Sequence, residues 1–129
     1  MGRNQRSVVV LSESDAAPSL AARLATPAPP SYASVEGLMR DQPLSSIAVL
    51  VVQTRALPSA MLLVTLGRIG LEYPAMQKVV VMDGPPPLPV AGYLTACGVD
   101  LVWAGGREAG TDQLAAVVDR MRERRQWIA

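Results

Sequence analysis

Each of four apolar runs in this sequence ends on residues that could take part in chemistry. The runs are Ser7–Leu11, Ile47–Val52, Lys78–Met82 and Leu101–Ala104. The residues that follow them are Ser12, Glu13, Gln53, Asp83 and Gly105. If the runs are parallel strands, these residues meet at one edge of a sheet, which is where open α/β sheets hold their ligands.

The residue types that the chain lacks exclude several kinds of chemistry. It has no His, which rules out His-based triads, His metal ligands and phosphohistidine chemistry. Cys97 is its single cysteine, so no internal disulfide and no multi-cysteine metal site can form. Nothing basic flanks Cys97, and we expect a buried, inert thiol. A chain without disulfides fits a reducing compartment, and we predict a cytoplasmic protein.

The charge balance does not indicate a nucleic acid or a membrane as partner. Twelve Lys and Arg against 11 Asp and Glu leave a net charge of +1, which is too small for a general attraction to anionic surfaces. The arginines near the end of the chain are interleaved with Asp119 and Glu123, which indicates a solvated helix face. No apolar run approaches the roughly 18 residues that a membrane helix needs.

Hydropathy and capping signals predict the elements that position these residues. Three of the four runs carry three Val each, which favours strands buried on both faces of a sheet. A weaker signal predicts one more short strand over Tyr32–Val35. The predicted helices start near Ser14 or Asp15 and then cover Gly37–Asp41, Ala60–Leu71, Val90–Ala96 and the stretch from Thr111 onward.

Spacing predicts the buried face of two of these helices. In Ala60–Leu71 the apolar residues at helical spacing are Met61, Leu62, Leu66 and Ile69. After Thr111 they are Leu114, Val117, Val118 and Met121.

Strand and helix alternate five times with short connections, which is typical of a doubly wound parallel sheet. We therefore predict an α/β, flavodoxin-like fold: five parallel strands in the order 2-1-3-4-5, with helices on both faces. No linker or internal repeat interrupts the pattern, so residues 1–129 are expected to form a single domain.

The order and spacing of these motifs resemble the receiver domains of bacterial two-component response regulators. The stretch IAVLVVQTRALPSAMLL resembles the third strand, the active-site turn and the start of the third helix of that family. KVVVMDG resembles its fourth strand, and LTACGVDLVWAGG resembles its Ala-Gly-Ala-Asp segment and fifth strand. The resemblance implies a signalling domain that binds other proteins and is not itself an enzyme.

The same resemblance implies that the phosphorylation site is degenerate. Gln53 stands where these domains carry the phosphate-accepting Asp, and Ser12 and Glu13 replace their acidic pair. Asp83 occupies the Ser/Thr position, and Gly105 begins the Gly-Gly that replaces Lys-Pro. A neutral amide cannot act as the nucleophile, and one carboxylate is a poor Mg²⁺ site. We expect no aspartyl phosphorylation, no metal and no cofactor.

These polar residues allow three interpretations. They are ordinary polar residues at strand ends, or a hydrogen-bonded cluster that mimics one fixed signalling state, or part of a ligand site. The leading hypothesis is a pseudo-receiver that acts as an interaction module in bacterial signal transduction or transcriptional regulation. The rival is a small-molecule-binding protein or enzyme that uses a crevice near Glu13, Asp83 and Arg107.

The resemblance also nominates an interaction face on the fourth helix, fifth strand and fifth helix. Its candidate residues are Leu94, Val102, Trp103, Val118 and Arg122. The expected partner is another protein, an output domain that follows this one in a longer regulator, or a second copy of the chain.

Overall fold

The computed structural model describes residues 7–12, 24, 29–41, 43–54, 59–82, 84–103 and 111–128. Its strands are β1 Ser7–Ser12, β2 Ser31–Tyr32, β3 Ile47–Gln53, β4 Gln77–Val81 and β5 Leu101–Trp103. Its helices are α2 Val35–Asp41, α3 Ala60–Glu72, α4 Leu88–Ala96 and α5 Thr111–Ile128, with a 3-10 turn η1 at Leu44–Ser46. None of the described helices is long and apolar enough to cross a membrane.

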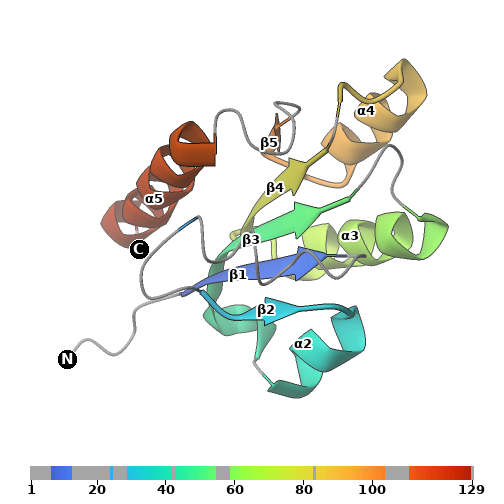
Figure 1. The fold of residues 1–129 in the computed structure, drawn as a ribbon. Helices are drawn as coiled ribbons and strands as arrows, with labels where there is room; N and C mark the ends of the chain where they lie inside the picture. Colours follow the sequence, from blue (N-terminus) through green and yellow to red (C-terminus); the bar gives the residue numbers. More distant parts are fainter. Residues whose placement is uncertain are drawn as a thin grey trace.

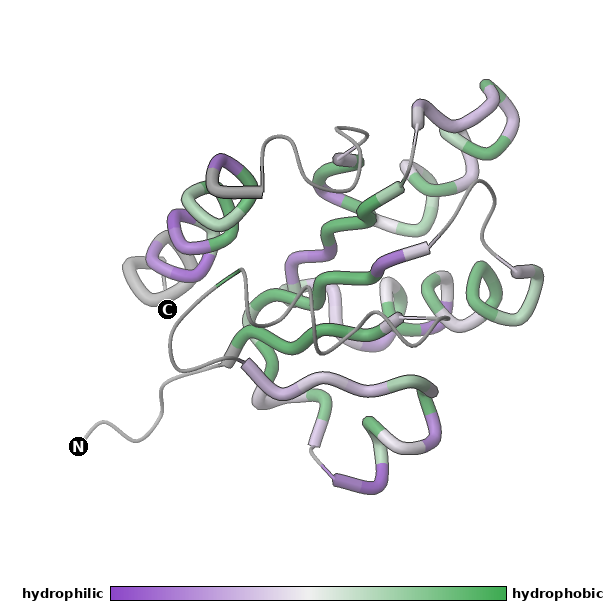
Figure 2. Tube along the Cα trace, viewed as in Figure 1, coloured by the Kyte–Doolittle hydropathy of each residue, from purple (hydrophilic) through white to green (hydrophobic). Residues whose placement is uncertain are grey.

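The five strands form one parallel sheet in the order β2-β1-β3-β4-β5 (Figure 1). This order confirms the predicted flavodoxin-like topology. The central strand β3 is buried at every position except its last, Gln53. Figure 2 shows hydrophobic residues gathered along the central strands. Continuous apolar strands of this kind are typical of a sheet that is covered on both faces.

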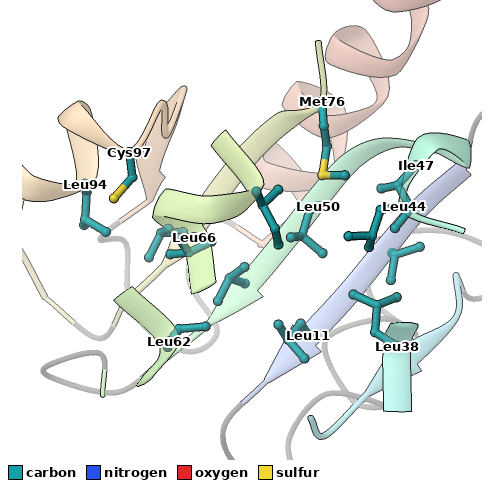
Figure 3. Close-up of a cluster of buried hydrophobic side chains, with 14 of the residues drawn as sticks. Leu11, Leu38, Leu44, Ile47, Leu50, Leu62, Leu66, Met76, Leu94 and Cys97 are labelled. Atoms are coloured by element: carbon teal, nitrogen blue, oxygen red, sulfur yellow. The ribbon is translucent and has the colours of Figure 1, made fainter. Parts of the chain in front are cut away.

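Helices cover both faces of the sheet. On one face Val9 and Leu11 of β1 pack with Leu38 of α2, Leu66 of α3 and Leu94 of α4 (Figure 3). On the other face, α5 and the helical residue Leu24 cover the sheet. Residues of that second core include Val10, Leu24, Val51, Val79, Leu114 and Val118. The alternation between the two cores follows from the two-residue period of the strands.

One predicted element is wrong in its bounds. The second strand was expected over Tyr32–Val35, but β2 ends at Tyr32 and α2 already begins at Val35. The reason is a local helix cap: the Gly37 backbone N–H donates to Ser34 Oγ at 3.0 Å. A Ser in that position satisfies a free amide of the first turn and favours helix over strand. The helix predicted after Ser14 or Asp15 lies outside the described residues, apart from its helical residue Leu24.

A second correction concerns the face of α3. Leu62, Leu66 and Ile69 are buried as their spacing predicts, but Met61 is 75% exposed. Since α3 is apolar nearly all round, periodicity alone could not separate its inner from its outer face.

The ends of α3 and α4 are fixed by specific local contacts. The Leu62 N–H donates to Ser59 Oγ at 3.1 Å, which caps the start of α3. Gly98 follows α4 with φ of +83°, a backbone conformation that glycine adopts without strain. That turn brings the chain back toward β5 and places Cys97 against α3.

Candidate functional site

The carboxyl edge of the sheet brings two of the predicted site residues together. Ser12 ends β1 and pairs in register with Gln53, which ends β3. Gln53 pairs in turn with Val81 of β4. The ladder continues one step beyond the strands, since Thr54 N–H donates to Val81 O at 2.9 Å. Neighbouring strands lie about 4.8 Å apart, so Ser12 and Gln53 are adjacent.

Gln53 has an unusual side chain for this position. Its Oε1 is buried and accepts no hydrogen bond within the described part of the chain. A buried acceptor without a partner costs about 1–3 kcal/mol relative to a satisfied one. The amide is neutral, so it offers neither a nucleophilic carboxylate nor a charged metal ligand.

The other predicted site residues are not placed by the structure. Glu13, Asp83, Gly105 and Arg107 lie outside the described residues. The crevice that these residues were expected to form therefore stays a prediction.

The Mg²⁺ ion that the receiver resemblance implies does not fit the described residues of this edge. Ser12 supplies a hydroxyl and Gln53 supplies an amide, and neither carries the charge that Mg²⁺ prefers in its ligands. Elsewhere in the described ranges, no three acidic, His or Cys side chains cluster in a way that could hold a metal.

A cavity of about 400 Å³ opens beside this edge. It lies where the end of β1 meets the first turns of α2 and α3. Ser12, Ser34, Glu36, Ser59, Met61 and Thr65 are among the residues that line it. The lining is mixed, because apolar residues of β1 and α3 contribute beside the hydroxyl groups. This cavity could not be predicted from the sequence, since its walls come from three separate elements with no shared motif.

The five residues nominated for an interaction face do not share one exposed surface. Leu94 has no exposed area and Val118 is 3% exposed, so both belong to the core. Val102 and Trp103 are half-buried, and they pack toward opposite faces of the sheet. Arg122 forms an ion pair with Asp119 on α5. Leu94 and Val118 are therefore too deeply buried to contact a partner.

Lys78 of β4 is a buried cation that the sequence analysis did not single out. It is 1% exposed, and its Nζ donates to Met76 O at 2.9 Å. Its backbone N–H donates to Asp100 Oδ2 at 2.8 Å. Burial lowers the pKa of Lys78, while Asp100 and Cys97 oppose that shift. The sequence carried a signal for this, because Lys78 shares one face of the buried strand β4 with Val80, which lies in the core.

Cys97 is buried, as predicted, and its environment does not activate it. Burial raises the pKa of the Cys97 thiol, and the Tyr93 hydroxyl and Lys78 oppose the rise without cancelling it. Sγ lies 3.9 Å from Leu63 O. A buried thiol with a raised pKa is a poor nucleophile.

Comparison with solved structures identifies the fold. No protein-family model and no curated protein matches the chain. A CheY-like response regulator receiver domain protein from Methanospirillum hungatei has a TM-score of 0.72 at 14% identity, over 96% of this chain and 99% of that one. An orphan response regulator of H. pylori gives 0.67 at 15% identity, over 94% and 99%.

A third similar structure comes from a protein described as pilus assembly-related, from Burkholderia pseudomallei. Its TM-score is 0.70 at 15% identity, over 95% of this chain and 93% of that one. At these identities the likeness establishes the fold alone. The chain has a flavodoxin-like fold that matches these receiver structures along nearly its whole length.

Proposed function

We propose that this chain is a phosphorylation-independent receiver-like domain that acts as a protein-interaction module in cytoplasmic signal transduction. One observation carries the proposal: Gln53 ends the central strand of a receiver-type sheet, directly beside Ser12. The receiver resemblance puts carboxylates at both positions. A neutral amide and a hydroxyl can neither accept a phosphoryl group in the family's way nor hold its metal ion.

The likeness to solved structures supports the interaction role without fixing the pathway. The similar proteins include response regulators and a protein described as pilus assembly-related. A receiver-type domain that lacks phosphate chemistry still exposes the outer faces of its helices, and a partner protein would bind there. The expected partner is another protein, an output domain or a second copy of the chain. An enzyme activity does not follow from the described residues.

Thermal melting with Mg²⁺ and beryllofluoride, a mimic of the aspartyl phosphate, tests this proposal. A ligand that binds the folded state raises the melting temperature. We expect no rise for this chain, and a clear rise for a phosphorylatable receiver measured in parallel. The Gln53→Asp variant is the matched control, and it should also show no rise, because Ser12 still leaves the acidic pair incomplete. A metal-dependent rise in the unsubstituted chain would contradict the proposal.

A second candidate function is supported by Gln53 Oε1, which accepts no hydrogen bond from the described residues. The cavity lies beside the neighbouring Ser12. A small ligand with a hydrogen-bond donor would satisfy that acceptor, and the crevice near Glu13, Asp83 and Arg107 would supply charge. This candidate predicts that small polar donors shift the amide resonances of Ser12 and Thr54 in a two-dimensional NMR spectrum. Loss of those shifts in Gln53→Met would support it, and an unchanged spectrum across such compounds would eliminate it.

A further inference from the structure

The outer face of α3 carries an apolar stripe that no described part of the chain covers. Met61 is 75% exposed, Val64 is 54% exposed and Leu71 is 85% exposed. Arg68 is the exposed polar residue between them. At 100° per residue these four positions fall within one narrow arc of the helix. The stripe therefore lies on one line, while Leu62, Leu66 and Ile69 face the core.

The position of α3 leaves this stripe open to a partner. The helix lies between α2 and α4 on its face of the sheet (Figure 1). Its inner face packs on the strands and its flank packs on α4, where Gly70 meets the Cys97 carbonyl. Large apolar residues in line on a solvent-facing helix are typical of an interaction surface.

The spacing within the stripe is the same in both chain directions. Met61, Val64, Arg68 and Leu71 are separated by three, four and three residues. Two copies of α3 packed antiparallel about a two-fold axis level with Leu66 therefore superpose the stripe on itself. Met61 of each copy then meets Leu71 of the other, and Val64 meets the aliphatic stem of Arg68.

The cavity supports the same arrangement. Met61 and Thr65 form part of its wall. Because Leu71 of a second copy would sit against Met61, that protruding side chain would lie beside a hollow rather than a flat surface. A projecting residue on one copy and a hollow on the other give the shape complementarity that an interface needs.

We propose that a second copy of this chain docks on the outer face of α3, with the two α3 helices antiparallel. This inference deepens the proposed interaction role by naming a partner, and it rests on that role. The helix has 13 residues, so its face is about 20 Å long. A face of that length and about 10 Å width covers roughly 200 Å², far less than the roughly 800 Å² per partner of a standard interface. The dimer is therefore weak and forms reversibly with concentration.

A pair of charge substitutions tests the antiparallel arrangement directly. Met61→Lys and Leu71→Glu should each weaken self-association at least about tenfold, because each places charges in the apolar contact twice per dimer. Mixing the two variants should restore association, since Lys at 61 of one copy then faces Glu at 71 of the other. Sedimentation velocity over a concentration series measures both effects.

Two controls keep the test specific. Leu88→Lys changes a leucine that is 87% exposed on α4, outside the stripe, and it should leave association unchanged. Arg68→Leu removes the charge within the stripe and should tighten the dimer. All substituted residues are exposed, so far-ultraviolet circular dichroism should remain that of the unsubstituted chain.

Three results would overturn the inference: a monomer at every concentration, a dimer insensitive to both charge variants, or no recovery on mixing. A dimer broken instead by Trp103→Ala would place the interface on β5. None of these results bears on phosphorylation, whereas a phosphate adduct would contradict the proposed function and leave the dimer untouched. The two failures can therefore be told apart.

Discussion

At the scale of single residues, the two least expected side chains are Gln53 and Lys78. Each is a polar group in or at the edge of the apolar sheet. Gln53 leaves Oε1 without a partner among the described residues, and Lys78 carries its amine into the core with Met76 O as acceptor. Each lowers stability relative to an apolar residue that packs equally well, because its desolvation is only partly offset.

Lys78→Met should change how stability depends on pH. The folded state holds the pKa of Lys78 below its ordinary value of 10.5. Between the lowered pKa of the folded state and the ordinary pKa of the unfolded state, the unfolded chain binds more protons than the folded chain. The unsubstituted protein therefore gains stability as the pH rises through that window. The variant lacks this gain. Urea unfolding of both proteins from about pH 7 to about pH 10.5 measures the difference.

Taking the difference between the two proteins is necessary because Cys97 titrates in an overlapping window. The pKa of its thiol is raised above 9.0 in the folded state, so its contribution falls as pH rises above the unfolded value. Since Lys78 opposes that rise, Lys78→Met would itself change this contribution, and both proteins are therefore compared in a Cys97→Ala background, which removes it. If the two stability curves run parallel, Lys78 is not a buried cation with a lowered pKa.

At the scale of elements, the contact between α3 and the end of α4 sets a strict limit on side-chain size. A Cβ added at Gly70 would lie 2.2 Å from the Cys97 carbonyl oxygen, which is far inside van der Waals contact. The same atom added at Gly92 of α4 would meet nothing within 4 Å. Two glycines in neighbouring helices thus stand in opposite environments.

Gly70→Ala and Gly92→Ala should therefore have opposite effects on stability. Alanine favours a helix over glycine by up to about 1 kcal/mol, and Gly92→Ala should gain part of that. Gly70→Ala should instead lose about 1–3 kcal/mol, because the backbone at Cys97 must move. The free energy of unfolding in urea measures both. A Gly70→Ala variant as stable as Gly92→Ala would contradict the close approach of α3 to Cys97.

The elements also show where sequence reasoning succeeds and where it stops. The run from Ile47 to Val52 predicts the central strand because every position is apolar and most are β-branched. The second strand was misplaced because the capping hydroxyl of Ser34 outweighs a weak strand signal. The exposed side of α3 could not be predicted, since only the packed structure shows that Met61 faces outward.

At the scale of the whole molecule, a flavodoxin-like parallel sheet carries Ser12 and Gln53 side by side at its carboxyl edge. The topology could be predicted because it depends on the alternation of strands and helices, which hydropathy encodes. The cavity and the partly buried β5 could not, because both depend on contacts between elements far apart in the sequence. Packing keeps the strand order without any need for carboxylates at its edge, so the topology could be predicted whatever chemistry the edge performs.

The central claim is that this fold does not take up a phosphoryl group, and intact mass spectrometry tests it most directly. The protein is incubated with acetyl phosphate and Mg²⁺ beside a phosphorylatable receiver, and both masses are read before any hydrolysis. The account predicts a phosphate adduct on the control and an unchanged mass for this chain. A phosphate adduct on this chain that requires Mg²⁺ would contradict the account.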